Sequence, residues 1–157
     1  MGGNIIMQQR HTITTISAAQ TQKVGQRLAR RLRGGEVLAL VGDLGAGKTV
    51  LARGIAQGLG IKHRIVSPTF ILMRVYPVRR HKKIRRLVHV DAYRIKHAND
   101  LLAIGLGDYL GKPDTVSVIE WADRVKKILP QKTVNITFRH GNTSSQRTIM
   151  MPKALPR

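Results

Sequence analysis

The chain has 157 residues, with 28 Lys and Arg against eight Asp and Glu, a formal charge of +20 and no cysteine. This length suits one domain with its own core, and the missing cysteines exclude a disulfide scaffold. The sequence lacks a membrane-length apolar stretch, a zinc-type histidine spacing, and a secretory signal pattern in residues 1–9. We expect one cytoplasmic domain over residues 1–157, with frayed tails at 1–11 and 152–157.

The hydrophobic pattern predicts an alternation of strands and helices along the chain. In chain order we expect a strand at 12–16, a helix at 18–33 capped by Ser17 and ended by Gly34-Gly35, a strand at 36–41, a helix at 50–56, strands at 70–76 and 84–94, a helix at 98–110, a turn at 111–114, a strand at 116–120, a helix from 122 to about 129, and a hairpin of 134–138 with 147–151. This order predicts an α/β fold: one domain with a central, mainly parallel sheet, helices on both faces and a C-terminal antiparallel hairpin.

Between the predicted strand at 36–41 and the helix at 50–56 lies a complete G-x-x-x-x-G-K-[ST] phosphate-binding loop. Glycines let backbone N–H groups surround phosphate oxygens, and the helix N-terminus adds its positive dipole end. Lys48 would reach the β- and γ-phosphates, and the Thr49 hydroxyl would ligate Mg²⁺. The predicted nucleotide-binding residues are Gly42, Asp43, Leu44, Gly45, Ala46, Gly47, Lys48, Thr49 and Val50, joined by Thr69 further along the chain. We therefore expect a P-loop protein that binds a nucleoside triphosphate.

Two of the eight acids end apolar runs: Asp91 follows 87–90, and Glu120 follows 116–119. Ligands of α/β folds sit outside the carboxyl ends of parallel strands, so both carboxylates would face the nucleotide. We expect Glu120 on the Mg²⁺ side and Asp91 to orient water, and the reverse assignment stays open. Strand alternation puts His89 and Tyr93 on the same face as Asp91, where they would position it or only pack.

Four motifs in fixed order resemble the signature series of the TsaE (YjeE) family. They are Gly42–Thr49, Ser67-Pro68-Thr69-Phe70, His89-Val90-Asp91-Ala92-Tyr93-Arg94 and Glu120-Trp121. Their order and spacing match from about Ile13 to about Asp123, and Thr21 and Gly25 also fall where the family carries them.

The resemblance implies a P-loop ATPase that uses ATP and Mg²⁺ and supports threonylcarbamoyladenosine modification of tRNA by acting on the TsaB and TsaD subunits. It implies catalytic roles for Lys48, Asp91 and Glu120, metal binding by Thr49, Glu120 and Asp91, and a mobile segment at 67–69 whose Thr69 lies near the γ-phosphate. Trp121 would lie beside the site, with Tyr93 and Arg94 as further candidates for the site or a partner surface. From the residues alone, Thr69 could instead form a simple turn, Trp121 could be a core residue, and Arg94 could make a structural ion pair.

The charge of +20 is atypical of the family, and a basic run lies at 74–86. A field of this sign attracts polyanions, so tRNA contact through the basic surface and a solvated turn are both open. The chain also carries only Asp100 where family members commonly have an acidic pair after the D-x-Y-R segment.

Two other function classes remain. One is a stand-alone P-loop kinase acting on a small molecule or nucleoside, for which no arginine-bearing lid or acceptor pocket can be assigned. The other is an RNA-binding module with a vestigial P-loop, which would leave Thr49, Asp91 and Glu120 unexplained. A GTPase is disfavoured because the N-K-x-D guanine-reading segment is missing.

Overall fold

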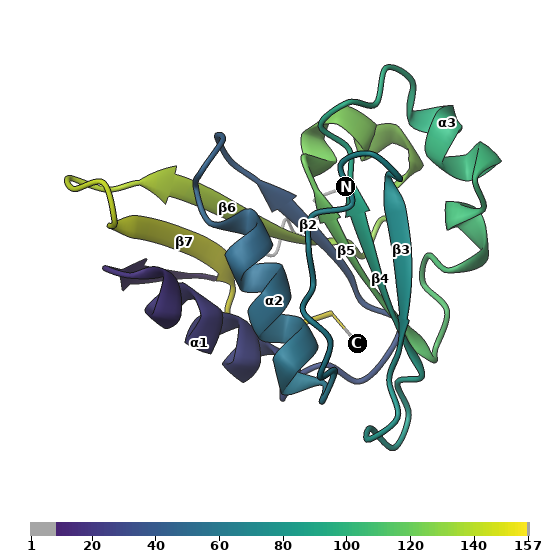
Figure 1. Cartoon of the computed structure of the whole chain (residues 1–157), viewed down its shortest axis with the longest axis horizontal. Coiled ribbons are helices and arrows are strands. Elements are labelled where there is room, and N and C mark those ends of the chain that lie inside the picture. Colours follow the sequence, from purple (N-terminus) through teal and green to yellow (C-terminus); the bar gives the residue numbers. More distant parts are fainter. Residues whose placement is uncertain (1–8, 157) are drawn as a thin grey trace, which may run out of the picture.

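The computed structural model describes residues 9–156, in which one mixed β-sheet carries helices on both faces (Figure 1). The elements are β1 (Arg10–Thr15), α1 (Ala18–Ala29), β2 (Val37–Val41), α2 (Lys48–Gly58), β3 (Met73–Pro77), β4 (Arg86–Asp91), α3 (Ala98–Ala103), the 3₁₀ turn η1 (Leu106–Asp108), β5 (Thr115–Glu120), the 3₁₀ segment η2 (Ala122–Ile128), β6 (Val134–His140) and β7 (Arg147–Pro152). The strand order in this part of the chain is β1-β7-β6-β2-β5-β4-β3. These elements confirm the predicted single α/β domain.

The centre of the sheet is parallel and its two edges are antiparallel. Strands β4, β5, β2 and β6 run in the same direction, whereas β3 pairs antiparallel with β4, and β7 lies antiparallel between β6 and β1. The predicted C-terminal hairpin is therefore confirmed as β6–β7. The prediction of a mainly parallel sheet holds only for the centre, because hairpin connections add antiparallel strands at both edges.

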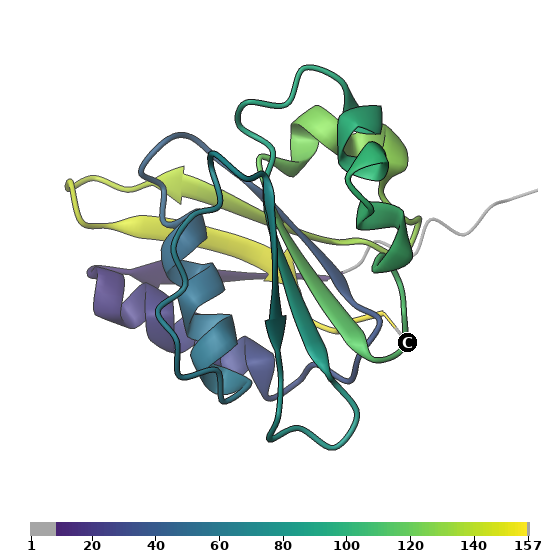
Figure 2. The ribbon, with the colours of Figure 1, turned by 45° about the vertical axis from the view of Figure 1, so that its right-hand side comes forward.

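Strand β2 is buried on both faces, which explains its continuous apolar sequence. Leu38 and Leu40 belong to a core cluster shared with α1 and α2, whereas Val37 and Ala39 join the cluster beneath α3, η1 and η2. Figure 2 shows α1 and α2 on one side of the sheet and the short helical segments on the other. No helix within residues 9–156 is both long and apolar enough to cross a bilayer.

Helices α1 and α2 pack closely where Gly25 faces Gly54. A Cβ at Gly25 would lie 2.4 Å from the Leu51 carbonyl oxygen and 2.9 Å from the Gly54 Cα. Both neighbours are backbone atoms, so the two helices would have to separate to admit a methyl group. The glycine at this position permits the observed helix contact.

We therefore expect Gly25→Ala to destabilise the fold by about 1–3 kcal/mol, the usual cost of overpacking a well-packed core. The gain in helix propensity, about 1 kcal/mol, offsets only part of this cost. Thermal denaturation followed by circular dichroism measures the change, with Lys23→Ala on the exposed face of α1 as the control. An unchanged midpoint for Gly25→Ala would show that the helices adjust without loss.

Several predicted boundaries are wrong for local reasons. Helix α1 ends at Ala29 rather than near residue 33, because Arg31 and Leu32 donate to Leu28 and Ala29 in a tighter turn that buries Leu32. Strand β4 ends at Asp91, so 92–94 lie outside it. The predicted helix at 98–110 is divided at Gly105, whose φ is 95°.

The segment 70–72 forms a turn in place of the predicted strand start. Ile71 and Leu72 both donate to the Pro68 carbonyl oxygen, and Leu72 has a φ of 63°. The Leu72 carbonyl then accepts from the Asp91 backbone N–H at 3.0 Å, which fixes the turn against β4.

The chain ends are more ordered than predicted. Arg10 and His11 pair with Pro152 and Met151 in the sheet, and the backbone of Lys153 bonds to Gln9. Leu155 packs against the core. The prediction of frayed tails is therefore wrong for residues 9–11 and 152–156. The rest of the predicted frayed ends, residues 1–8 and 157, lies outside the described residues. The same holds for the segment 1–9 that was expected to lack a secretory signal, of which only Gln9 is described.

Candidate functional site

The phosphate-binding loop lies between β2 and α2, at the edge where the parallel strands end (Figure 1). Gly47 caps α2, and Lys48 is its first residue. The β6–β7 hairpin braces this loop from the side: Arg147 donates to the Gly45 carbonyl oxygen at 2.9 and 3.2 Å, and His140 Nε2 lies 3.2 Å from the Leu44 carbonyl oxygen. The hairpin thus restrains the loop's backbone.

Lys48 is only 5% exposed and folds back over the loop. Its ammonium group donates to the carbonyl oxygens of Gly42 and Asp43 and lies 3.9 Å from the centre of the Trp121 ring. Burial lowers the pKa of Lys48, and the nearby Glu120 carboxylate opposes this shift. The Lys48 ammonium group can exchange these carbonyl oxygens for the oxygens of a bound phosphate.

Thr49 bonds to Glu120 across the site. The Thr49 hydroxyl lies 3.0 and 2.8 Å from the two Glu120 carboxylate oxygens, and the register of β2 with β5 brings Glu120 beside Leu40. On its other side, Glu120 Oε1 lies 2.7 Å from His89 Nε2. His89 is fully buried, so the carboxylate is held between two side chains of fixed position.

Asp91 holds the 67–69 segment against the sheet. Its Oδ2 accepts from the hydroxyls of Ser67 at 2.6 Å and Thr69 at 2.9 Å, and its Oδ1 accepts from the Tyr93 backbone N–H at 3.0 Å. Because β4 and β5 are parallel and in register, Asp91 lies next to Glu120. The two carboxylates that end these strands therefore share one edge of the sheet.

Trp121 covers the lysine in a left-handed backbone conformation with a φ of 57°. This conformation is uncommon for a large residue and places the indole over Lys48 instead of in the strand direction. Tyr93 packs against it with ring centres 4.9 Å apart, and the Arg124 guanidinium lies 5.3 Å from Tyr93 and 5.8 Å from Trp121.

The structure brings together most of the residues singled out from the sequence. Contacts link Lys48, Thr49, Thr69, Asp91, Tyr93, Glu120 and Trp121 across four segments of the chain. Arg94 is different: it makes no ion pair within residues 9–156, and its guanidinium lies 4.9 Å from the Phe70 ring centre. The open alternative of a structural ion pair for Arg94 is therefore wrong.

Sequence reasoning missed several contacts of this site. His89 was expected to position Asp91 or to pack, yet it contacts Glu120. Ser67 was part of a motif with no assigned partner, and Arg124, His140 and Arg147 carried no local signal. The last two reach the loop from the C-terminal hairpin, about 100 residues away in the chain.

The residues present fit a nucleotide with Mg²⁺. Within the described residues, no three His, Cys, Asp or Glu side chains form a metal-binding group. A cation here would thus have one or two carboxylates and the Thr49 hydroxyl as protein ligands, and would need phosphate and water oxygens for the remainder. That is the donor set Mg²⁺ prefers.

Comparisons with known proteins agree with one another. The family model for "Threonylcarbamoyl adenosine biosynthesis protein TsaE" matches residues 15–149. A tRNA threonylcarbamoyladenosine biosynthesis protein TsaE of Treponema pallidum is 42% identical over 123 residues, 78% of this chain and 87% of that protein. Its counterpart in Bacillus subtilis is 34% identical over 127 residues, 81% of this chain and 76% of that protein. The crystal structure of YdiB from Bacillus subtilis superimposes with a TM-score of 0.74 at 30% identity, covering 94% of this chain and 87% of that one.

Proposed function

The chain belongs to the TsaE family of tRNA threonylcarbamoyladenosine biosynthesis proteins, and from that premise we propose that it is a Mg²⁺-dependent ATPase acting on the TsaB–TsaD transferase complex. The observation that carries this proposal is the contact of the Thr49 hydroxyl with both oxygens of Glu120, directly beside the buried Lys48. A P-loop hydroxyl and a strand-end carboxylate are the two protein groups that hold Mg²⁺ in P-loop enzymes.

In this proposal, Lys48, Thr49 and the loop backbone bind the triphosphate, and bound Mg²⁺ neutralises the charge that develops on the phosphates. Glu120 is the metal-side carboxylate, because it touches Thr49 and is fixed by His89. Asp91 orients the attacking water, because it lies beside Glu120 at the same sheet edge.

The 67–69 segment acts as the switch of the proposed cycle. Thr69 and Ser67 are both bonded to Asp91, so contact of Thr69 with a γ-phosphate requires release of its bond to Asp91. Such a release would open one acceptor position on Asp91 Oδ2 to water when ATP is bound, while Ser67 and the Tyr93 N–H keep the carboxylate in place. A segment ordered by the γ-phosphate and released after hydrolysis is a known device of P-loop proteins.

Exposed apolar side chains around the site support a protein partner there. Leu44 on the phosphate loop is 75% exposed, and Phe70 and Ile71 beside the switch segment are 85% and 51% exposed. Clustered exposed apolar residues commonly mark interaction sites. We propose that this surface meets the TsaB–TsaD complex, so that the partner senses the state of the switch.

Trp121 is the only tryptophan of the chain, and its contact with Lys48 makes it suitable as a probe of nucleotide binding. We expect ATP with Mg²⁺ to change its fluorescence, because transfer of the Lys48 ammonium to phosphate removes a cation that lies 3.9 Å from the ring. A fluorescence titration measures the affinity, and Lys48→Ala serves as the control that should lose the response. If ATP with Mg²⁺ produces no fluorescence change and calorimetry detects no heat of binding, the proposed ATP binding is contradicted.

A further inference from the structure

The end of the molecule opposite the phosphate-binding loop gathers loops from the whole chain. Strands β2, β4, β5 and β6 all begin there, and α1 and α2 return to it (Figures 1 and 2). The segments that meet at this basic edge, as we name it, are 30–36, 59–65, 78–86, 111–114, 129–133 and 153–156. The topology therefore places it a full strand length from the nucleotide site.

Every segment of the basic edge carries lysine or arginine. The 78–86 segment has the densest run, with Lys82 and Lys83 both exposed, and 30–36 contributes the exposed Arg30 and Arg33. The acids within these segments are Glu36 and Asp114. The six segments therefore carry a local excess of cations.

Neither acid forms an ion pair with Arg30, Arg33, Lys82 or Lys83 in the described part of the chain. The two Glu36 carboxylate oxygens accept from the backbone N–H groups of Arg33 and Gly34, and Asp114 pairs with Arg86. Arg30, Arg33, Lys82 and Lys83 form no ion pair within residues 9–156. Cations without an acidic partner keep their attraction for an outside anion.

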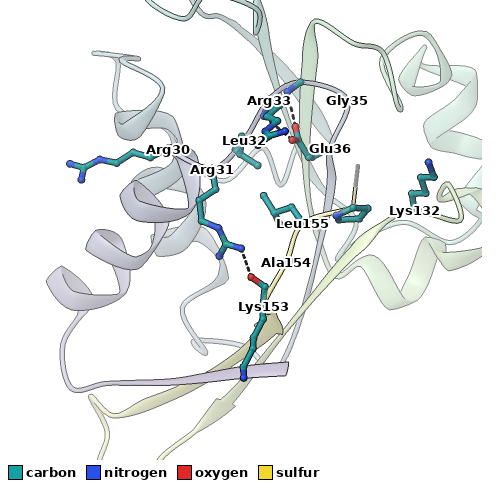
Figure 3. Close-up of a pocket in the computed structure, with 12 residues that line it drawn as sticks. Arg30, Arg31, Leu32, Arg33, Gly35, Glu36, Lys132, Lys153, Ala154 and Leu155 are labelled. Atoms are coloured by element: carbon teal, nitrogen blue, oxygen red, sulfur yellow. Dashed lines mark hydrogen bonds between the residues drawn. The ribbon is translucent and has the colours of Figure 1, made fainter. Parts of the chain in front are cut away.

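A recess of about 910 Å³ opens within this edge, between the end of α1 and the C-terminal segment (Figure 3). Arg30, Arg31 and Arg33 line it from one side, and Lys132 and Lys153 also line it. Arg31 donates to the Lys153 carbonyl oxygen and so holds the C-terminal segment in place. Five of the side chains that line the recess are therefore basic.

We propose that the basic edge binds the phosphate backbone of RNA. The large hydrophobic side chains exposed in the described residues lie outside its six segments, which removes the apolar surface that a membrane contact needs. The segments also contain no Phe, Tyr or Trp on which bases could stack. Contacts of arginine and lysine with phosphates carry no sequence information, so we expect binding that does not depend on base sequence.

The choice of tRNA as the RNA to test rests on the proposed role in tRNA modification, but the binding itself needs no ATP chemistry. Because the basic edge and the phosphate-binding loop lie at opposite ends of the sheet, RNA and ATP should bind together. Saturating ATP with Mg²⁺ should leave the RNA affinity unchanged, and Lys48→Ala should bind RNA like the unmodified chain. A failure to detect ATP hydrolysis would therefore leave the proposed RNA binding intact. A failure to detect RNA binding would likewise leave the proposed ATPase activity intact.

Fluorescence anisotropy with an unmodified tRNA transcript, repeated over a series of salt concentrations, tests the proposal. The edge variant reverses four charges: Arg30→Glu, Arg33→Glu, Lys82→Glu and Lys83→Glu. The control variant makes the same change in net charge at exposed positions elsewhere: Lys23→Glu, Lys96→Glu, Lys126→Glu and Lys127→Glu. Circular dichroism and the Trp121 titration verify that both variants fold.

We expect the edge variant to bind tRNA at least tenfold more weakly and its salt slope to fall by about 3, as for the loss of four phosphate contacts. The control variant should stay within about threefold of the unmodified chain. An equal loss in both variants would mean that only total charge matters, and would overturn the proposal. Unchanged tRNA binding by the edge variant, or loss only of its binding to the TsaB–TsaD complex, would also overturn it and assign the edge to solvent or to a protein partner.

Discussion

Lys48→Ala is expected to lower ATP turnover by at least about 10²–10³-fold, the usual effect of removing one preorganised group that stabilises transition-state charge. The ammonium is buried beneath Trp121 and held by two loop carbonyl oxygens, which keeps it over the phosphate-binding loop. Release of inorganic phosphate under saturating Mg²⁺ measures the turnover. Thr49→Ala should have a similar effect, because it removes the hydroxyl that faces Glu120.

Lys62→Ala is the matched control for Lys48→Ala, since Lys62 is an exposed lysine on the loop after α2. It should hydrolyse ATP at the rate of the unmodified chain. Retained turnover in Lys48→Ala would remove Lys48 from the phosphate-binding machinery, and with it the assignment of this loop as the catalytic centre.

Asp91→Asn is expected to reduce turnover by about 10²–10⁴-fold while sparing ATP affinity, since it removes a charged group that orients or activates water. The amide oxygen of asparagine can still accept from the Tyr93 N–H, and its NH2 group can donate to the hydroxyl oxygens of Ser67 and Thr69, so the local structure should survive. Single-turnover hydrolysis and a binding titration of the same preparation separate the two effects.

Ser67→Ala provides the comparison for Asp91→Asn, because it removes one bond to Asp91 without touching the carboxylate. It should change turnover far less than Asp91→Asn. Equal loss of ATP affinity and turnover in Asp91→Asn would make Asp91 a binding residue. Asp91 would then be the metal-side carboxylate, and Glu120 would be the group that orients water.

The centre of the fold was predictable because its signals are local. An apolar run of strand length, a glycine-rich loop and a helix define β2, the phosphate-binding loop and α2 within about 20 residues. The neighbouring positions of Asp91 and Glu120 followed from one further rule, that parallel strands end at the same edge of a sheet.

The contacts that complete the site were not predictable, because they depend on tertiary placement. His89 reaches Glu120 only because β4 and β5 pair in one particular register. The cover over Lys48 depends on the left-handed backbone of Trp121, for which its sequence position carries no signal. The basic edge is also a property of the topology, since its loops are scattered along the chain and meet only in the folded sheet.

The boundaries failed where a side chain or a turn overrides the hydrophobic pattern. The 70–76 segment looks like a strand throughout, yet Pro68 accepts two backbone bonds and turns the chain before Met73. That turn places the switch segment over Asp91, so the same deviation from the predicted strand also builds the proposed switch.

ATP turnover by the purified protein, alone and with its TsaB–TsaD complex, tests the central claim most directly. We expect slow hydrolysis by the protein alone and marked stimulation by the complex, with both activities lost in Lys48→Ala. Rapid hydrolysis that is indifferent to the complex would contradict the account and return the chain to a stand-alone P-loop enzyme.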